Sequence, residues 1–166
     1  MDTISKEQRS RTMSRIRSNN TKPEMLVRRF LYANGFRYRV NVKTLPGTPD
    51  IVLKKFHLVI FIHGCFWHSH ECQNGRMPKT NVAFWQQKLT RNKERDAEVR
   101  EKLRCMGWKT LIVWECQLKP AIRQQTLQEI AYILNSVELE RLHTKYKLPE
   151  EPIRIAAEEA PRYGKC

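Results

Sequence analysis

The sequence lacks long apolar runs, and it has too few acidic residues to balance its basic ones. No apolar stretch approaches the ~20 residues of a membrane-spanning helix, and Met1 is followed by polar residues rather than by a secretion signal. Apolar residues make up 40% of the chain and charged residues 29%, which is ordinary for a globular domain. These features exclude membrane and fibrous proteins. A chain of 166 residues also needs no disulfide framework to fold.

The shortage of acidic residues is confined to one part of the chain. The sequence holds 31 Lys and Arg residues against 17 Asp and Glu residues, a net charge of +14. Residues 1–110 hold 23 basic and 9 acidic residues, whereas residues 111–166 hold 8 of each. Such an excess favours binding to a polyanion, because each neutralised phosphate releases counterions. A membrane surface is a weaker candidate, since no long basic helix carries an exposed apolar face.

Cysteines are few but clustered. The five cysteines are an odd number, and without a secretion signal we expect a reducing cytoplasm. The segment Cys65–Cys72, CFWHSHEC, packs two Cys and two His into eight residues. In a reduced compartment such a cluster indicates a metal site before it indicates disulfides.

Hydrophobic patterning predicts an α/β fold, a mixed central β-sheet flanked by helices. A capping box, Thr21-Lys22-Pro23-Glu24, begins the first long helix, which ends at Gly35. The further expected elements are strands at 36–42, 50–53, 58–63 and 110–116 (the last covered on both faces) and helices at 82–106 and 120–137. In domain terms, we expect a basic N-terminal arm at 1–20, a main domain at 21–137 and a loosely ordered C-terminal extension at 138–166.

A zinc site follows from the topology of the second half. The strand ending near Cys65, the helix at 82–106 and the strand ending near Cys116 form a βαβ unit whose strands should be parallel. The two thiols therefore meet at one edge of the sheet, and Cys72 follows in the adjoining loop. Three Cys and one His form a closed structural zinc set. The sequence leaves His68 or His70 as the fourth ligand, and His70 is better placed.

An acid and a histidine share the predicted hairpin. A four-residue loop places Leu53 opposite Leu58 and Asp50 opposite Phe61, close to His63. A carboxylate beside a His and a backbone carbonyl, in a cationic protein, suits Mg²⁺-assisted phosphodiester hydrolysis. The competing explanation for Asp50 is that its side chain caps the preceding turn.

The long helix adds a second acid. Asn92 and Asp96 interrupt its apolar stripe, which runs from Trp85 to Met106 in steps of three and four. A buried carboxylate needs a partner. A loop histidine oriented by Asp96 would form a general base, and an Arg would form a structural ion pair. The sequence leaves both open.

These residues together resemble the very short patch repair (Vsr) DNA mismatch endonucleases. The likeness spans about residues 5–118, and HGCFWH with its trailing Cys and WEC is its most specific part. The matching stretches are Arg9-Ser10…Met13…Ile16, LPGTPD at 45–50, VIFIHGCFWH at 59–68, Phe84-Trp85, Glu94-Arg95-Asp96 and Gly107-Trp108…LIVWEC at 111–116. The resemblance implies a restriction-endonuclease-like fold of the PD-(D/E)XK type, in which Phe61 and His63 replace the usual second acid and Lys.

The resemblance also implies an enzyme, a Mg²⁺-dependent endonuclease. Its substrate is double-stranded DNA, nicked 5′ to the T of a T:G mismatch that arises from 5-methylcytosine deamination. By position, Asp50 and the carbonyl of Ile62 hold Mg²⁺. His68, backed by Asp96, activates the attacking water, and His63 acts on the leaving-group side through metal-bound water.

The remaining family positions concern zinc and DNA. Glu24 matches a family acid near the site, although the capping box already explains it. The resemblance assigns four Zn²⁺ ligands, Cys65, His70, Cys72 and Cys116. Phe66, Trp67 and Trp85 form a wedge beside the mismatch, and Met13 of the basic arm probes the opposite groove. The competing expectation is that the three aromatic residues belong to the core.

Two other functions stay open at this level. One is a restriction-type endonuclease that cuts matched sites, and the other is a zinc-stabilised DNA-binding module without catalysis. The carboxylate and histidines of the proposed catalytic set argue against the second, because a binding module needs no metal-poised acid. We further expect a monomeric, cytoplasmic bacterial protein associated with the nucleoid and with repair-pathway proteins, and no membrane association.

Overall fold

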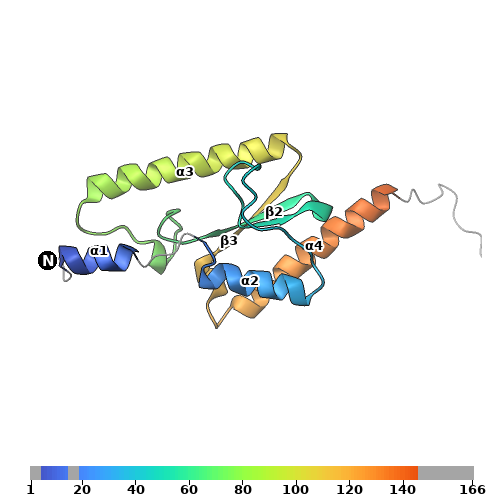
Figure 1. Ribbon diagram of the computed structural model, residues 1–166, viewed down its shortest axis with the longest axis horizontal. Coiled ribbons are helices and arrows are strands. Elements are labelled where there is room, and N and C mark those ends of the chain that lie inside the picture. The colour runs from blue at the N-terminus through green and yellow to red at the C-terminus, as the bar shows by residue number, and fades with distance from the viewer. Residues whose placement is uncertain (1–4, 15–18, 146–166) are drawn as a thin grey trace, which may run out of the picture.

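A three-stranded sheet with helices on both faces forms the body of the protein in this computed structural model (Figure 1). The structure describes residues 5–14 and 19–145. The elements are α1 (Lys6–Ser14), α2 (Lys22–Ala33), β1 (Ile51–Leu53), β2 (Leu58–His63), α3 (Val82–Cys105), β3 (Lys109–Trp114) and α4 (Arg123–Lys145), with short 3₁₀ turns at Lys54–Phe56, Gln73–Gly75 and Glu115–Leu118. No helix among these residues is both long and apolar enough to cross a membrane.

The sheet is mixed, as the patterning predicts. β2 lies in the centre, antiparallel to β1 and parallel to β3. Leu53 pairs with Leu58, so the hairpin register derived from a four-residue loop is confirmed. The parallel pairing runs to His63 opposite Trp114. The βαβ unit therefore brings the ends of β2 and β3 to one edge of the sheet, where the predicted metal ligands follow.

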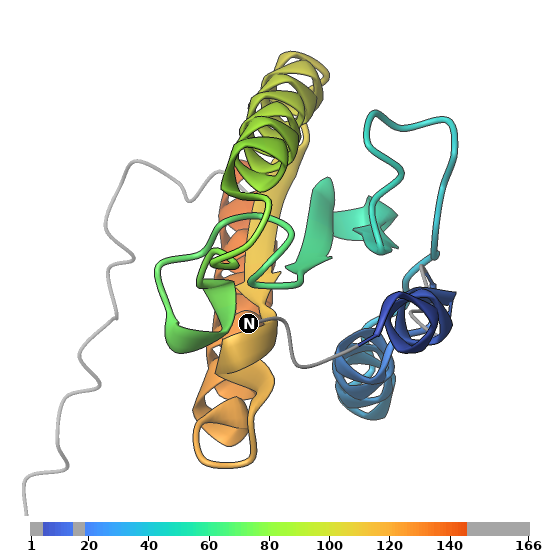
Figure 2. The same ribbon diagram turned by 90° about the vertical axis from the view of Figure 1, so that its left-hand side faces the viewer.

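Helices cover the two faces unequally (Figures 1 and 2). On one face α2 and α4 pack on the sheet, and the larger core joins apolar side chains of both helices and all three strands, such as Leu31, Ile60 and Leu134. On the other face a smaller core joins Val52, Val59, Phe61 and Leu103 of α3. The alternation along β2, one residue to each core, fixes the register strongly.

Two strand predictions are wrong. Residues 36–42 form a single isolated bridge, Arg39 to Val52, instead of a strand, and Asn41 has a left-handed φ of 47° that breaks the extended run. The strand near 110–116 is shorter than expected and is not covered on both faces. Within the described residues β3 lies at the sheet edge with only Val113 buried; the fully covered strand is β2.

The predicted helix boundaries are correct at the start of α2 but displaced at the ends of α3 and α4. The capping box at Thr21 and Glu24 is confirmed, with reciprocal hydrogen bonds at the start of α2. α3 ends one residue early, and Met106 at the end of the predicted stripe is 50% exposed. α4 continues past residue 137 to Lys145. The predicted C-terminal extension thus begins inside this helix, residues 146–166 lie outside the described part, and the domain division stays a prediction.

Candidate active site and metal centre

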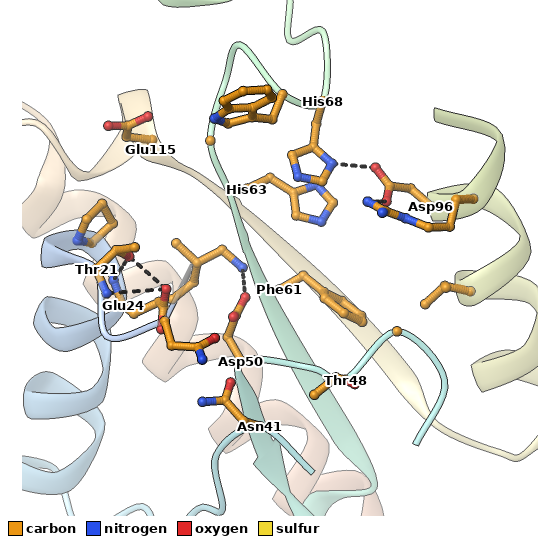
Figure 3. Close-up of a pocket in the computed structure, with 18 residues that line it drawn as sticks. Thr21, Glu24, Asn41, Thr48, Asp50, Phe61, His63, His68, Asp96 and Glu115 are labelled. Atoms are coloured by element: carbon orange, nitrogen blue, oxygen red, sulfur yellow. Dashed lines mark hydrogen bonds and ion pairs between the residues drawn. The ribbon is translucent and has the colours of Figure 1, made fainter. Parts of the chain in front are cut away.

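A cavity of about 780 Å³ opens beside the end of β2, between the N-terminus of α2 and the middle of α3. Its walls include every residue predicted to act in catalysis or to bind Mg²⁺, namely Glu24, Asp50, Ile62, His63, His68 and Asp96. Figure 3 shows Glu24 and Asp50 on one side of the cavity and the His68–Asp96 pair on the other. The topology alone gathers these residues, since they come from α2, the start of β1, β2, the following loop and α3.

Asp50 is placed by a tight turn and by its neighbour across the hairpin. Its carboxylate Oδ2 accepts a hydrogen bond from the backbone N–H of Ile62, at 2.8 Å. Gly47 of the preceding turn, with φ of 72°, packs closely on Val99 of α3. Burial raises the pKa of the Asp50 carboxyl, although the hydrogen bond from Ile62 favours its charged form. A bound cation would offset this penalty, so the position suits a metal ligand.

Asp96 pairs with a histidine inside the cavity and also forms a longer ion pair with an arginine. His68 Nδ1 is hydrogen-bonded to Asp96 Oδ2, and both side chains are about four-fifths buried. Arg95 also approaches Asp96, at 3.5 Å, but it is largely exposed. Because Nδ1 is engaged by the carboxylate, Nε2 is the nitrogen that can accept a proton.

His63 lies in direct contact with this pair. Its ring stacks on that of His68, with centroids 3.7 Å apart, and meets the edge of Trp114. Burial lowers the pKa of His63 to about 4, and the neighbouring His68 adds to the effect. His63 is therefore neutral near pH 7, where it can donate or accept one hydrogen bond without bringing a second positive charge.

The cysteine cluster forms a separate centre. One ligand atom from each of Cys65, His70, Cys72 and Cys116 lies within 4.8 Å of all the others. The loop is compact: the His70 N–H donates to the Cys65 carbonyl at 2.9 Å. Geometry thus selects His70 over His68 for this group. A Cys₃His set at such separations fits the tetrahedral ligand shell of Zn²⁺, in which thiolate sulfurs stand about 3.8 Å apart.

The aromatic residues form a cluster around Trp67. The rings of Phe66, Trp67 and Trp85 lie 5.1–6.2 Å apart, all half-buried. Trp67 also lines the cavity. Asn92, the polar residue in the stripe of α3, donates a hydrogen bond to the Trp67 carbonyl at 2.9 Å. The cluster belongs to neither of the two buried cores.

Three further residues contribute to the site, and the sequence predicts no role for them. Lys88 lies 5.3–5.8 Å from the rings of Trp67, Phe84 and Trp85. Trp114 stacks on His70 as well as contacting His63. Arg28 is buried against Glu24, and its spacing of four residues on α2 is a signal that could have revealed the pair. The side chain of Met13 lies outside the described part of the chain, so its predicted role stays a prediction.

Comparison with known proteins decides the family. A family model described as DNA mismatch endonuclease Vsr matches residues 1–74. The DNA mismatch endonuclease Vsr of Escherichia coli K12 is 41% identical over 118 residues, which cover 71% of this chain and 76% of that protein. The chain belongs to the Vsr family. The predicted resemblance is thereby confirmed.

Two other similar proteins carry a different title. The Type II nicking enzyme V.NmeAIP of Neisseria meningitidis is 51% identical over 118 residues, covering 71% of this chain and 84% of that protein. The Type II nicking enzyme V.XorIIP of Xanthomonas oryzae is 44% identical over 117 residues, covering 70% and 86%. The Vsr family is one of DNA endonucleases, so the predicted class of enzyme is confirmed at this level, and the mixed α/β fold is compatible with it.

Proposed function

We propose that this protein nicks double-stranded DNA 5′ to the T of a T:G mismatch left by 5-methylcytosine deamination, as the first step of very short patch repair. The observation that carries the proposal is the shared cavity: a half-buried carboxylate, Asp50, lies across from the His68–Asp96 pair, and Trp67 also lines the cavity. The net charge of +14 supports a DNA substrate. A monomer acting on the bacterial chromosome in the cytoplasm completes the proposal.

The chemistry assigned to the cavity is general-base hydrolysis. His68 Nε2 takes a proton from the attacking water while Asp96 holds the ring and stabilises the imidazolium. His63, neutral at pH 7, serves the leaving-group side. Asp50 and the Ile62 carbonyl would hold Mg²⁺, which supplies Lewis-acid stabilisation of the charge that develops on the phosphate.

The cysteine centre is assigned to structural zinc. Cys65, His70, Cys72 and Cys116 join the loop after β2 to the end of β3. A closed four-ligand site contributes folding energy directly. The loop so held carries Phe66, Trp67 and His68, so zinc would fix both the wedge and the base.

Mismatch selection is assigned to the aromatic cluster. A T:G pair stacks poorly, and a protein that inserts apolar side chains spends only a few kcal/mol to unstack a step there. Phe66, Trp67 and Trp85 already pack against one another, so little further ordering is needed on binding.

A second candidate is a nicking enzyme for matched sites. It is favoured by the similarity to V.NmeAIP and V.XorIIP, which are both named Type II nicking enzymes. The distinguishing experiment uses three labelled duplexes that differ at one position, which holds a T:G, a T:A or a C:G pair. The set is prepared in several flanking sequences. Nicking in MgCl₂ of the T:G duplex alone supports mismatch repair, and equal nicking of a matched duplex supports the second candidate.

A non-catalytic binding module is tested in the same assay. Loss of nicking in EDTA, and in Asp50→Ala with retained DNA binding, is expected of the proposed enzyme. The charge-matched control is Glu98→Ala, which removes an exposed acid on α3 and should nick normally. Binding without nicking by the wild-type protein under all metal conditions would contradict the proposal.

A further inference from the structure

The N-terminal half of α2 buries an ion pair beside the cavity. Glu24 and Arg28 are each only 4% exposed and lie one helical turn apart. Arg28 Nη2 donates to Glu24 Oε2 at 2.8 Å, and Nη1 donates to the Asn20 side-chain oxygen at 2.6 Å. Glu24 is held further by the Thr21 hydroxyl, at 2.8 Å, and by the Asn20 N–H. The Glu24 carboxylate is therefore fully engaged.

The same guanidinium also contacts the opposite acid. Arg28 Nη2 donates to the backbone carbonyl of Asp50 at 3.2 Å. Asp50 is thus fixed from two sides, since its main chain is held by Arg28 and its carboxylate by the N–H of Ile62. Arg28 joins two carboxyl residues of the cavity, through the side chain of Glu24 and the main chain of Asp50.

Fold stability is a poor explanation for this arginine. Arg28 Nε is buried with no hydrogen-bond partner among the described residues, and an unsatisfied buried donor is destabilising. Buried ion pairs are often no better for stability than apolar side chains of the same volume. The large core that contains Val27 and Leu31 lies beside Arg28 on α2, so an apolar residue would pack there.

We propose that Arg28 is a positioning residue for Asp50, an inference that rests on the proposed nuclease function. It holds the peptide from which the Asp50 carboxylate projects, and it neutralises Glu24. Of Glu24 and Asp50, only Asp50 then keeps an uncompensated charge for a divalent cation. Groups that orient a metal ligand in this way typically change metal affinity or activity by about 10- to 100-fold when they are removed.

The test is a double-mutant cycle between Arg28→Met and Glu24→Gln, with Arg28→Lys as the conservative variant. Glu24→Gln removes the charge that Arg28 neutralises but keeps the shape of the side chain. The matched control is Arg29→Met, which removes an exposed arginine from the next position of α2. Three quantities are measured for each variant: the thermal unfolding midpoint, the nicking rate of a T:G duplex at saturating MgCl₂, and Mn²⁺ binding without DNA, followed by electron paramagnetic resonance.

If Arg28 positions Asp50, replacing Arg28 should lower the nicking rate and the Mn²⁺ affinity even when the Glu24 charge has been removed. Arg28→Met should lower both the nicking rate and the Mn²⁺ affinity by roughly tenfold or more, in the wild-type background and again in Glu24→Gln. The unfolding midpoint should fall in Arg28→Met and recover in the double variant. Arg28→Lys should retain part of the activity, and Arg29→Met should match wild type.

Two outcomes would overturn the proposal. If Arg28→Met in the Glu24→Gln background changes nicking and Mn²⁺ affinity less than twofold, Arg28 only compensates Glu24. If all losses follow the unfolding midpoint, the role is structural. Failure of the proposed function itself would look different, since the wild-type protein would then nick no T:G duplex while the Mn²⁺ measurements still tested Arg28.

Discussion

At the scale of single residues, two loop histidines have different partners although only one residue separates them. His68 contacts Asp96 and His63, whereas His70 lies among the three cysteines and stacks on Trp114. Ser69 between them has a left-handed φ of 50°, which turns the chain sharply. The reversal sends neighbouring side chains to separate centres.

Substitution of each histidine should therefore give a different loss. His68→Ala should leave a folded protein that retains zinc and nicks T:G duplex at least about 100-fold more slowly, since general-base catalysis contributes about that much. His70→Ala should lose zinc or several degrees of thermal stability, because a structural zinc site contributes folding energy. Zinc content by mass spectrometry and a thermal melt separate the two. The reverse pattern would mean that the two roles are exchanged.

The residue-scale predictions succeed where the chain register alone decides the neighbours. The hairpin register places Asp50 beside Ile62, and the parallel strands bring Cys65 near Cys116. Arg28 was missed because its contact with Asp50 spans 22 residues of sequence and depends on how α2 docks on the sheet. No local pattern encodes that docking angle. The roles assigned to these residues stay predictions.

At the scale of elements, the turn before β1 is tightly constrained by α3. Gly47 has φ of 72°, and an added Cβ would lie 2.5 Å from Val99 Cγ1 on α3. Gly35 offers a matched comparison, since it has φ of 80° but no atom within 4 Å of an added Cβ. The two positions share the backbone strain and differ only in the clash.

Gly47→Ala should destabilise the protein more than Gly35→Ala. Backbone strain alone is worth about 1 kcal/mol at such positions, and overpacking adds about 1–3 kcal/mol. The free energy of unfolding in urea measures both. Val99→Ala should rescue part of the Gly47→Ala loss and none of the Gly35→Ala loss. Equal effects at the two glycines would show that α3 simply moves away from the turn.

The aromatic cluster joins the loop after β2 to the start of α3. Trp67→Ala should keep the fold and the zinc, because its ring is only half-buried, but it should narrow the preference for T:G over matched duplex. Competition binding with both duplexes measures the preference, and Tyr132→Ala, an exposed aromatic change on α4, is the control. A fall of many degrees in the unfolding midpoint with unchanged preference would identify Trp67 as a core residue.

Elements were predicted well where a pattern had a local cause. The capping box sets the start of α2, and the alternation along β2 sets its two faces. The segment near Arg39 was misread because a loose alternation predicts a strand, while the left-handed Asn41 decides against one. The pattern predicts too early an end for α4 because Val137 is the last residue that packs on the core and most residues beyond it are charged or polar.

At the scale of the whole molecule, the affinity for DNA and the preference for T:G pairs should respond differently to salt. All of the +14 excess lies in residues 1–110, and these residues include all that line the cavity except Glu115. Affinity for any duplex should fall by roughly a hundredfold or more between about 50 and about 200 mM NaCl, because counterion release drives it. The ratio of T:G to matched affinity should change far less, since base-step insertion releases few ions. Fluorescence anisotropy with both duplexes measures the two quantities, and a ratio that collapses with salt would contradict the wedge.

The loop from Cys65 to Cys72 limits how such a protein can evolve. Its side chains divide between two destinations, with Cys65, His70 and Cys72 in the cysteine centre and Trp67 and His68 lining the cavity. One inserted or deleted residue would displace the residues that follow it from these positions. The segment can therefore drift by substitution but hardly by a change of length, and it should behave as a unit of fixed size when grafted between related chains.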